Sequence, residues 1–440
     1  MKMNCKGVAA RVASLALFLG MLAGAGLAAR ATYAQAAAAQ PKYTMTEYKA
    51  YQAAAAEANP QQKIKLLDGF VAQYPQSELL PYVYDEYLKV YSATKDWAKV
   101  IEYFDKKLAL PNLEPGPRLQ TLYGRAATFE YACNAKSPDL TACATKARDA
   151  ALEGAKALAA FQRPANATDE QWATLKKQYG TQFSNTAASA SFYLKDYKAA
   201  AQYYHDALTI DPTQAVDDYR LGLADLQQTP PQSLAGFWAL ARAIDLKIPD
   251  ADKVQKFLHD KMYEYQTPGC EASIDAQIKD MLAQAQNSPD PPANFSIPSA
   301  ADLGKVRESA NIQTVLADLK AGGDKGKLTW LAVCNGEFPE ALAKAYEVNA
   351  TDPANITIKA ALGTTEEELN ASTAPNGDLK IAGQPDAARL EKDSIFRFSG
   401  KVTGYTPDPF NLSWENVKVN AEDIPEEKGK KPAKRPAKKP

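Results

Sequence analysis

The chain has 440 residues, which is enough for two or three domains with hydrophobic cores of their own. Its 51 basic and 52 acidic side chains nearly balance, and it has only two histidines and no Cys-x-x-Cys pair. Because zinc sites draw on clustered cysteine and histidine ligands, this composition argues against a metal site. We expect no metal and no other cofactor.

The first 36 residues have the features of a secretory signal peptide. Basic residues precede an apolar stretch at residues 12–29, and the small-x-small sequence Ala34-Gln35-Ala36 follows as a cleavage site. Cys5 precedes the apolar stretch, whereas a lipoprotein has its cysteine directly after it. No later stretch approaches the roughly 20 apolar residues that a membrane span requires. We therefore expect an exported chain, periplasmic or secreted, with no transmembrane segment after cleavage; an uncleaved membrane anchor is the alternative.

Paired helices are expected over residues 44–287. Large residues recur at helical spacing, and Pro75 and Pro111 stand where helices should stop, because proline cannot continue a helix. The predicted segments, in chain order, are a loose pair over 44–75, a second pair over 77–111, two alanine-rich helices within 118–160, a long helix over 169–193 that leads into the clearest repeat at 195–212, and a further pair over 215–246. Two more helices, over 253–265 and 274–285, are expected to cap the array.

The clearest pattern lies between residues 195 and 222. Small residues at Ala200 and Ala207 flank the aromatic Tyr204, Pro212 closes the unit, and Gly222 lies in the next helix. Small residues at these positions let two antiparallel helices approach closely, while the aromatic ring fills the gap between them. The spacing of these residues fits a repeat of 34 residues, which favours a helical solenoid over a generic helix bundle.

On these residues, the segment 44–287 resembles exported bacterial tetratricopeptide (TPR) repeat proteins. The resemblance implies a concave groove, lined mainly by the first helix of each repeat, that holds an extended peptide or a protein partner. The positions that match the groove of the family, with two aromatic neighbours, are Asp85, Lys89, Asn185, Ser189, Tyr219, Phe192 and Tyr193. Ordinary helix surface is the alternative interpretation of these residues.

A proline-rich stretch at residues 288–299 has the composition of a linker. Beyond it, residues 301–319 are expected to form one amphipathic helix that stops at Gly322-Gly323. Short runs that alternate with period two then predict four or five strands, at residues 356–362, 379–382, 396–402, and 410–414 with 417–419; the turn at residues 406–409 joins the last two runs. Residues 300–420 thus read as a small mixed α/β or antiparallel β domain, with an OB-like barrel as one form of it.

Charge is placed unevenly along the chain. Residues 37–427 have 40 basic against 52 acidic side chains, whereas residues 428–440 have seven basic side chains and no acidic one. Such a basic, proline-broken end cannot bury apolar surface, so residues 421–440 are expected to be a disordered tail. Its role is either that of a solvated end or that of a weak tether to anionic envelope material. Nucleic acid is not an expected partner of an exported protein.

Four cysteines remain after cleavage, and four cysteines allow three disulfide pairings. Cys133 and Cys143 flank a helix-ending turn, so a helical hairpin brings them together at little loop cost. That leaves Cys270 for Cys334, a bond expected to staple the repeat region to the C-terminal domain. Free buried thiols are the alternative.

Nothing in the sequence predicts catalysis. His205 is expected on a helix surface, and the glycine-rich stretch at residues 322–328 lacks the spacing and the Ser or Thr of a phosphate loop. The favoured function is that of a non-enzymatic scaffold or adaptor that holds a protein or peptide in its solenoid groove. The alternative function is binding of an envelope polymer or other ligand by the C-terminal domain, with the repeats as a spacer.

Overall fold

The computed structural model describes residues 42–426 except 135–136, 268–269, 287 and 353–354. The predicted signal peptide at residues 1–36 lies outside the described residues, as does the tail beyond residue 426. The chain forms two compact units. Unit 1 comprises the described residues up to Gln255 together with Ala285–Pro291, and unit 2 comprises Lys256–Gln284 and the residues from Pro292 onward.

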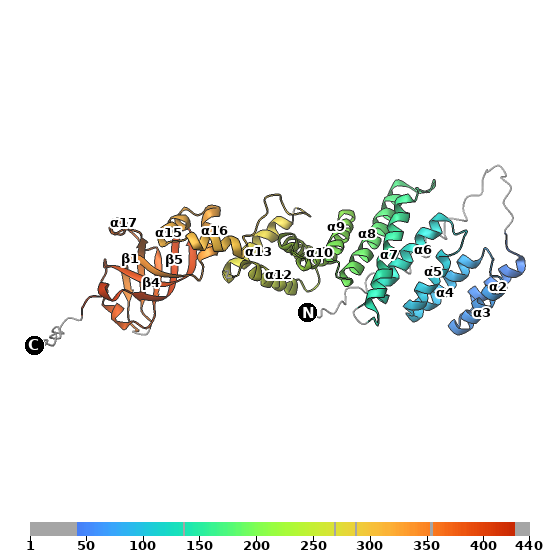
Figure 1. Cartoon of the computed structure of the whole chain (residues 1–440), viewed down its shortest axis with the longest axis horizontal. Coiled ribbons are helices and arrows are strands. Elements are labelled where there is room, and N and C mark those ends of the chain that lie inside the picture. The colour runs from blue at the N-terminus through green and yellow to red at the C-terminus, as the bar shows by residue number, and fades with distance from the viewer. Residues whose placement is uncertain (1–41, 135–136, 268–269, 287, 353–354, 427–440) are drawn as a thin grey trace, which may run out of the picture. The chain divides into compact units, whose positions relative to one another are not determined.

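Unit 1 is helical, and its helices follow one another in chain order, each beside the next (Figure 1). Within its described residues they are α2 (Met45–Ala56), α3 (Pro60–Gln73), α4 (Leu80–Thr94), α5 (Trp97–Leu108), α6 (Pro115–Ala132), α7 (Leu140–Ala160), α8 (Asp169–Tyr193), α9 (Tyr197–Ile210), α10 (Ala215–Gln227), α11 (Ser233–Asp245) and the start of α12 (Ala251–Gln266).

Small residues and an aromatic ring close the contact between α8 and α9, as the sequence predicts. Ala200 and Ala207 are fully buried, and Tyr204 is 2% exposed. The Tyr204 hydroxyl lies 3.1 Å from the Ser189 hydroxyl on α8. Between α10 and α11, a Cβ atom at Gly222 would lie 2.9 Å from the main-chain oxygen of Gly236, which is closer than real Cβ atoms approach. Glycine at this position therefore allows the two helices to touch.

The same turn joins two of the helix pairs. Lys95 and Lys195 have positive φ angles of 59° and 61°, and each precedes an aspartate that caps the following helix. Asp96 accepts a hydrogen bond from the amide of Lys99, and Asp196 accepts one from the amide of Ala199. A left-handed residue followed by an N-cap reverses the chain within two residues. The α4–α5 and α8–α9 connections are thus built alike.

A substitution at Ala200 tests this packing. Ala200→Leu inserts a larger side chain where two helices touch, so we expect a loss of about 1–3 kcal/mol in the free energy of unfolding. Ala199→Leu on the same helix, at a half-buried position, is the matched control and should change stability much less. Thermal unfolding measures both; equal melting temperatures for the two variants would show that the helix contact is misplaced.

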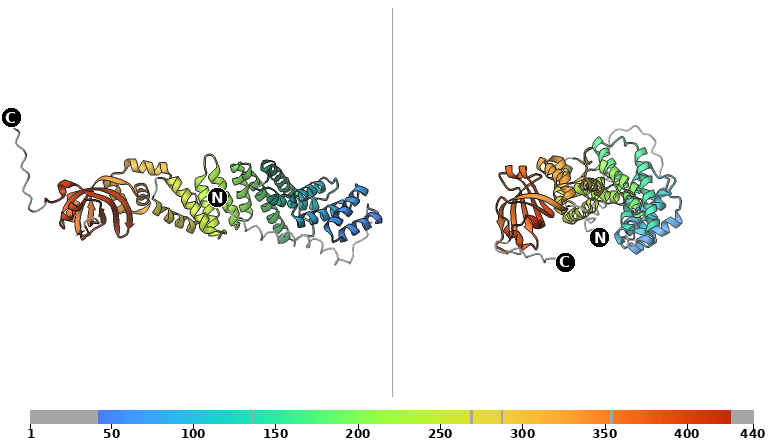
Figure 2. Two further views of the ribbon diagram at one scale, coloured as in Figure 1. Left: turned by 90° about the horizontal axis from the view of Figure 1, so that it is seen from below. Right: turned by 60° about the vertical axis from the view of Figure 1, so that its left-hand side comes forward.

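Unit 2 combines helices with a closed barrel of five strands (Figure 2). Its helices are the rest of α12, most of α13 (Glu271–Ala285), α14 (Ala300–Ser309), α15 (Ile312–Ala321), α16 (Gly323–Val333) and α17 (Glu366–Ala371). Its strands are β1 (Glu337–Asn349), β2 (Thr357–Gly363), β3 (Gly377–Ile381), β4 (Ile395–Pro407) and β5 (Phe410–Val419).

The barrel closes in the order β1-β2-β3-β5-β4, with β3 and β5 parallel and the other neighbours antiparallel. Gly400 lies in β4 where the register with β5 shifts, and a Cβ there would lie 3.0 Å from the Val417 side chain. Glycine thus lets β4 bend sharply as the barrel closes. Phe396, Phe398 and Trp414 are at most 2% exposed and form a core with side chains from α14, α15 and α16.

One helix prediction is wrong in detail. The segment expected as a single helix over 301–319 is two helices, α14 and α15, separated at Ala310 and Asn311. The Asn311 side chain accepts a hydrogen bond from the amide of Thr314, and the Thr314 hydroxyl lies within hydrogen-bond distance of the Asn311 amide. This capping box begins a new helix and overrides the continuous amphipathic pattern. Strand β1 was not predicted.

Both predicted cysteine pairs form disulfides, Cys133–Cys143 and Cys270–Cys334. The first joins the end of α6 to the start of α7, as the helical-hairpin argument requires. Cys270 and Cys334 both belong to unit 2, so their bond crosslinks parts of one unit. Two disulfides indicate an oxidising, extracytoplasmic environment. Within the described residues, no helix combines the length and apolar character needed to cross a membrane.

Candidate functional site

The seven groove positions expected from the sequence lie on three helices of unit 1, in two groups. Asp85 and Lys89 are on α4, and both are engaged locally. The Lys107 ammonium, 7% exposed, lies 2.5 Å from an Asp85 oxygen, and Lys89 donates to the nearly buried Glu86. Burial raises the pKa of Glu86, but hydrogen bonds from Lys89 and Lys63 outweigh it and leave that pKa below its ordinary value. Charge reversal at Asp85 would therefore leave a buried ammonium without its partner.

The other group spans α8 and α10. Asn185 is 1% exposed and donates to Asp217 on α10 at 2.9 Å, while Ser189 contacts Tyr204. Phe192 packs against Tyr197 with ring centroids 5.2 Å apart. Only Tyr193, at 40% exposure, presents a large free surface, and Tyr219 on α10 is half-buried. Asn185, Ser189 and Phe192 thus hold neighbouring helices together.

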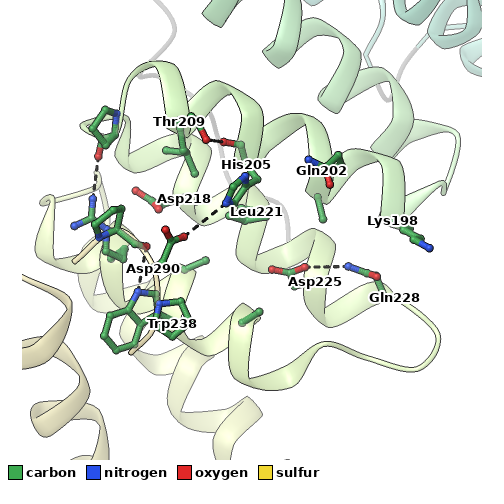
Figure 3. A pocket seen from close by; sticks show the side chains of 18 residues that line it. Lys198, Gln202, His205, Thr209, Asp218, Leu221, Asp225, Gln228, Trp238 and Asp290 are labelled. Carbon is green, nitrogen blue, oxygen red and sulfur yellow. Dashed lines mark hydrogen bonds and ion pairs between the residues drawn. The ribbon is translucent and has the colours of Figure 1, made fainter. Parts of the chain in front are cut away.

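A cavity in unit 1 lies away from these positions, over α9, α10 and α11 (Figure 3). Its volume is about 590 Å³, within the range of small-ligand and peptide side-chain pockets. Leu208, Leu221 and Trp238 give it apolar walls. Pro289, Asp290 and Pro291, from the segment without helix or strand that follows α13, complete one side.

One donor on α11 binds this segment. Trp238 donates through Nε1 to the Pro289 carbonyl oxygen at 3.2 Å. Arg242, also on α11, donates through Nη1 to the carbonyl oxygen of Ala285, the last residue of α13, at 3.1 Å and through Nη2 to the Pro212 carbonyl oxygen at 2.9 Å. His205 on α9 faces Asp290, with Nε2 3.6 Å from the carboxylate (Figure 3). Helices α9–α11 thus already hold a proline-containing segment of main chain, with Trp238 as its donor.

Two buried carboxylates on α10 face the cavity. Asp218 is 3% exposed, and its Oδ2 has no hydrogen-bond partner among the described residues. Burial raises its pKa to about 7; the Arg242 charge opposes this shift, and Asp217 and Asp290 add to it. Asp225 is 7% exposed and accepts a hydrogen bond from Gln228 at 2.9 Å. Burial raises the pKa of Asp225 to about 6, against the influence of Gln228 and His205.

Sequence reasoning did not single out these two carboxylates. Acidic residues in the first turn of a helix are ordinary, which hides Asp218. A usable signal exists in the spacing, because Asp218, Leu221 and Asp225 share one face of α10. A carboxylate on both sides of an apolar residue on a packed helix face is unusual, since buried charges are costly unless they are paired.

The arrangement has no feature of a metal centre. Among the residues that the structure describes, no group of three or more His, Cys, Asp or Glu side chains gathers to hold a metal ion. Comparison with known proteins finds no matching family model and no matching curated protein.

Proposed function

We propose that this chain is an exported, non-enzymatic binding protein whose helical unit is a TPR-like solenoid that holds an extended segment of a partner protein. The similar turns at Lys95 and Lys195 and the close helix contacts at Ala200 and Gly222 support the solenoid assignment. The leader at residues 1–36 and the two disulfides support export to the periplasm or the exterior.

The observation that carries the proposal is the docked segment on α9–α11. Trp238 donates to the main-chain carbonyl of Pro289, a group that every peptide presents, and the apolar walls beside it leave room for side chains. Main-chain hydrogen bonds provide affinity without dependence on sequence, while pockets beside them read side chains. Helices that already bind one such segment of their own chain are suited to bind another.

A second function is supported by the barrel. Its strand order, with β3 parallel to β5, resembles that of OB-fold barrels, which bind oligomers on the face of strands β2 and β3. Here that face is occupied by charge pairs: Lys359 lies 3.4 Å from Glu347, and Lys380 lies 4.0 Å from Glu415. Stacking platforms for polymer rings need exposed aromatic side chains. Exposed large apolar residues in the described chain all lie outside the barrel, so the helical unit is the preferred site.

Substitutions on the two units distinguish these functions. Thr209 is exposed and lines the cavity, so Thr209→Trp fills it without disturbing the core. We expect capture of the partner from envelope extract by the tagged full chain to fall at least tenfold. Lys359→Glu with Lys380→Glu, on the barrel face, should leave capture unchanged. The reverse pattern, with capture lost only through the barrel substitutions, would favour the polymer-binding function.

A further inference from the structure

The cavity on α9–α11 contains an unsatisfied carboxylate in addition to the side-chain donors that bind main-chain carbonyls. Asp218 lines the cavity, is almost fully buried, and leaves Oδ2 without a partner among the described residues. Burying a carboxylate without a compensating donor is unfavourable by several kcal/mol in typical cases. A side chain kept in this state within a cavity indicates a ligand that supplies the missing donor.

The neighbouring arginine does not fill this role. Both terminal nitrogens of Arg242 donate to main-chain carbonyls, those of Ala285 and Pro212, and its Nε has no partner among the residues described. Its charge is close enough to favour the ionised form of Asp218, but it donates no hydrogen bond to it. Of the other basic side chains that line the cavity, Lys198 is exposed and His205 faces Asp290. The buried Oδ2 of Asp218 therefore has no donor among the described residues.

A second carboxylate lies at a defined distance along the same helix. Asp218 and Asp225 are seven positions apart on α10, which corresponds to about 10 Å along the helix axis. Leu221 lies between them on the same face, and Asp290, from the segment that follows α13, adds a third carboxylate to the lining (Figure 3). The cavity thus presents negative groups at two points separated by apolar surface.

We propose that this cavity recognises a partner segment with two basic side chains three positions apart, one ammonium for Asp218 and one for Asp225. In a polyproline II segment each residue advances about 3.1 Å, so residues three apart are about 9 Å apart on one side. This matches the carboxylate spacing on α10. The apolar stems of the lysines pack against Leu221 and Trp238, while their ammonium groups reach the carboxylates. The inference rests on the proposed peptide-binding function and adds the chemistry of the partner.

The test measures binding of the peptide fluorescein-Gly-Gly-Lys-Pro-Ala-Lys-amide, with the dye on the terminal amine, to the full chain by fluorescence polarisation. The matched peptide has norleucine in place of both lysines, which keeps the apolar stems and removes the charges. We expect the lysine peptide to bind at least tenfold more tightly than the norleucine peptide. We also expect Asp218→Asn and Asp225→Asn each to weaken lysine-peptide binding by about tenfold to a hundredfold, as charge-assisted hydrogen bonds are lost.

Asp149→Asn is the control, because Asp149 is an exposed carboxylate on α7 outside the cavity. It removes the same charge and should leave the affinity unchanged; circular dichroism confirms the fold of each variant. Equal binding of both peptides would overturn the inference and leave peptide binding itself in place. No binding of either peptide would overturn both. If Asp149→Asn and Asp218→Asn lowered the affinity for the lysine peptide equally, the effect would come from net charge alone, which would contradict a defined site.

Discussion

Replacing Asp218 by asparagine is expected to raise the free energy of unfolding at pH 8 by about 1–3 kcal/mol. Burial raises the pKa of Asp218 to about 7 in the folded chain, whereas an unfolded aspartate titrates near 3.9. Between these two values the unfolded chain has released the proton that the folded chain still binds. The free energy of unfolding of the wild-type protein therefore falls as the pH rises from about 4 to about 7, by up to about 4 kcal/mol from Asp218. Above pH 7 proton binding by Asp218 no longer stabilises the folded chain.

Urea unfolding at a series of pH values measures this effect. The wild-type stability should decline from pH 4 to 7, with Asp225, whose pKa burial raises to about 6, contributing to the lower part of the decline. The Asp218→Asn variant should have a flatter profile and exceed the wild type most at pH 8. Asp149→Asn, which changes an exposed carboxylate, should follow the wild-type curve. Parallel profiles for wild type and Asp218→Asn would show that the carboxylate is not destabilising where it lies.

The second large effect concerns the disulfide Cys270–Cys334. In the chain-entropy model, removal of a crosslink that closes a loop of this size destabilises the folded state by about 4 kcal/mol. The cysteines are 64 positions apart, against 10 positions for Cys133 and Cys143, and the shorter loop corresponds to about 3 kcal/mol. The double variant Cys270→Ala/Cys334→Ala should therefore lose more stability than Cys133→Ala/Cys143→Ala.

The two double variants serve as matched controls for each other, since each removes one bond and two sulfur atoms. Thermal unfolding of both, beside the wild type, gives the comparison. Because Cys270 and Cys334 both belong to unit 2, the loss should appear as lower protection from proteolysis in α13 and α16. A larger loss from the Cys133–Cys143 removal would mean that loop length does not govern the effect.

Residue patterns in the sequence predicted the structure well where a single local interaction determines it. The small–aromatic–small pattern at Ala200, Tyr204 and Ala207 placed a tight helix contact, because only small residues allow it. The predicted strands agree with β2 to β5, since alternation reports one buried face. By contrast, β1 pairs at its two sides with β2 and β4 and has irregular register with both, so its burial pattern does not alternate cleanly.

The candidate cavity was harder to predict from the sequence. It is assembled from three helices and a segment about 50 residues further along the chain, where Trp238 meets Pro289. Such long-range juxtaposition leaves no local periodicity. The groove residues transferred from the family resemblance, such as Asn185 and Asp85, are engaged with Asp217 and Lys107 inside the unit. A position in a repeat fixes the helix face, but the partners on neighbouring helices determine whether the side chain is free.

The carboxylates on α10 connect stability with binding. Asp218 lies almost fully buried with an unpartnered oxygen, which is an unfavourable arrangement for the folded chain alone. Binding sites commonly keep such groups, since an interaction made only with the ligand cannot also stabilise the free protein. The same substitution, Asp218→Asn, is therefore expected to stabilise the chain and to weaken its binding of a basic segment.

Site-specific photo-crosslinking in the cell envelope tests the central claim most directly. A photoreactive residue at Gln202, which is exposed and lines the cavity, reports on α9–α11, and one at Lys359 reports on the barrel face. We predict that Gln202 crosslinks to one defined segment of a partner protein, that mass spectrometry finds basic residues three positions apart in it, and that Asp218→Asn abolishes the product. Crosslinks from Lys359 alone, with none from Gln202, would contradict the account.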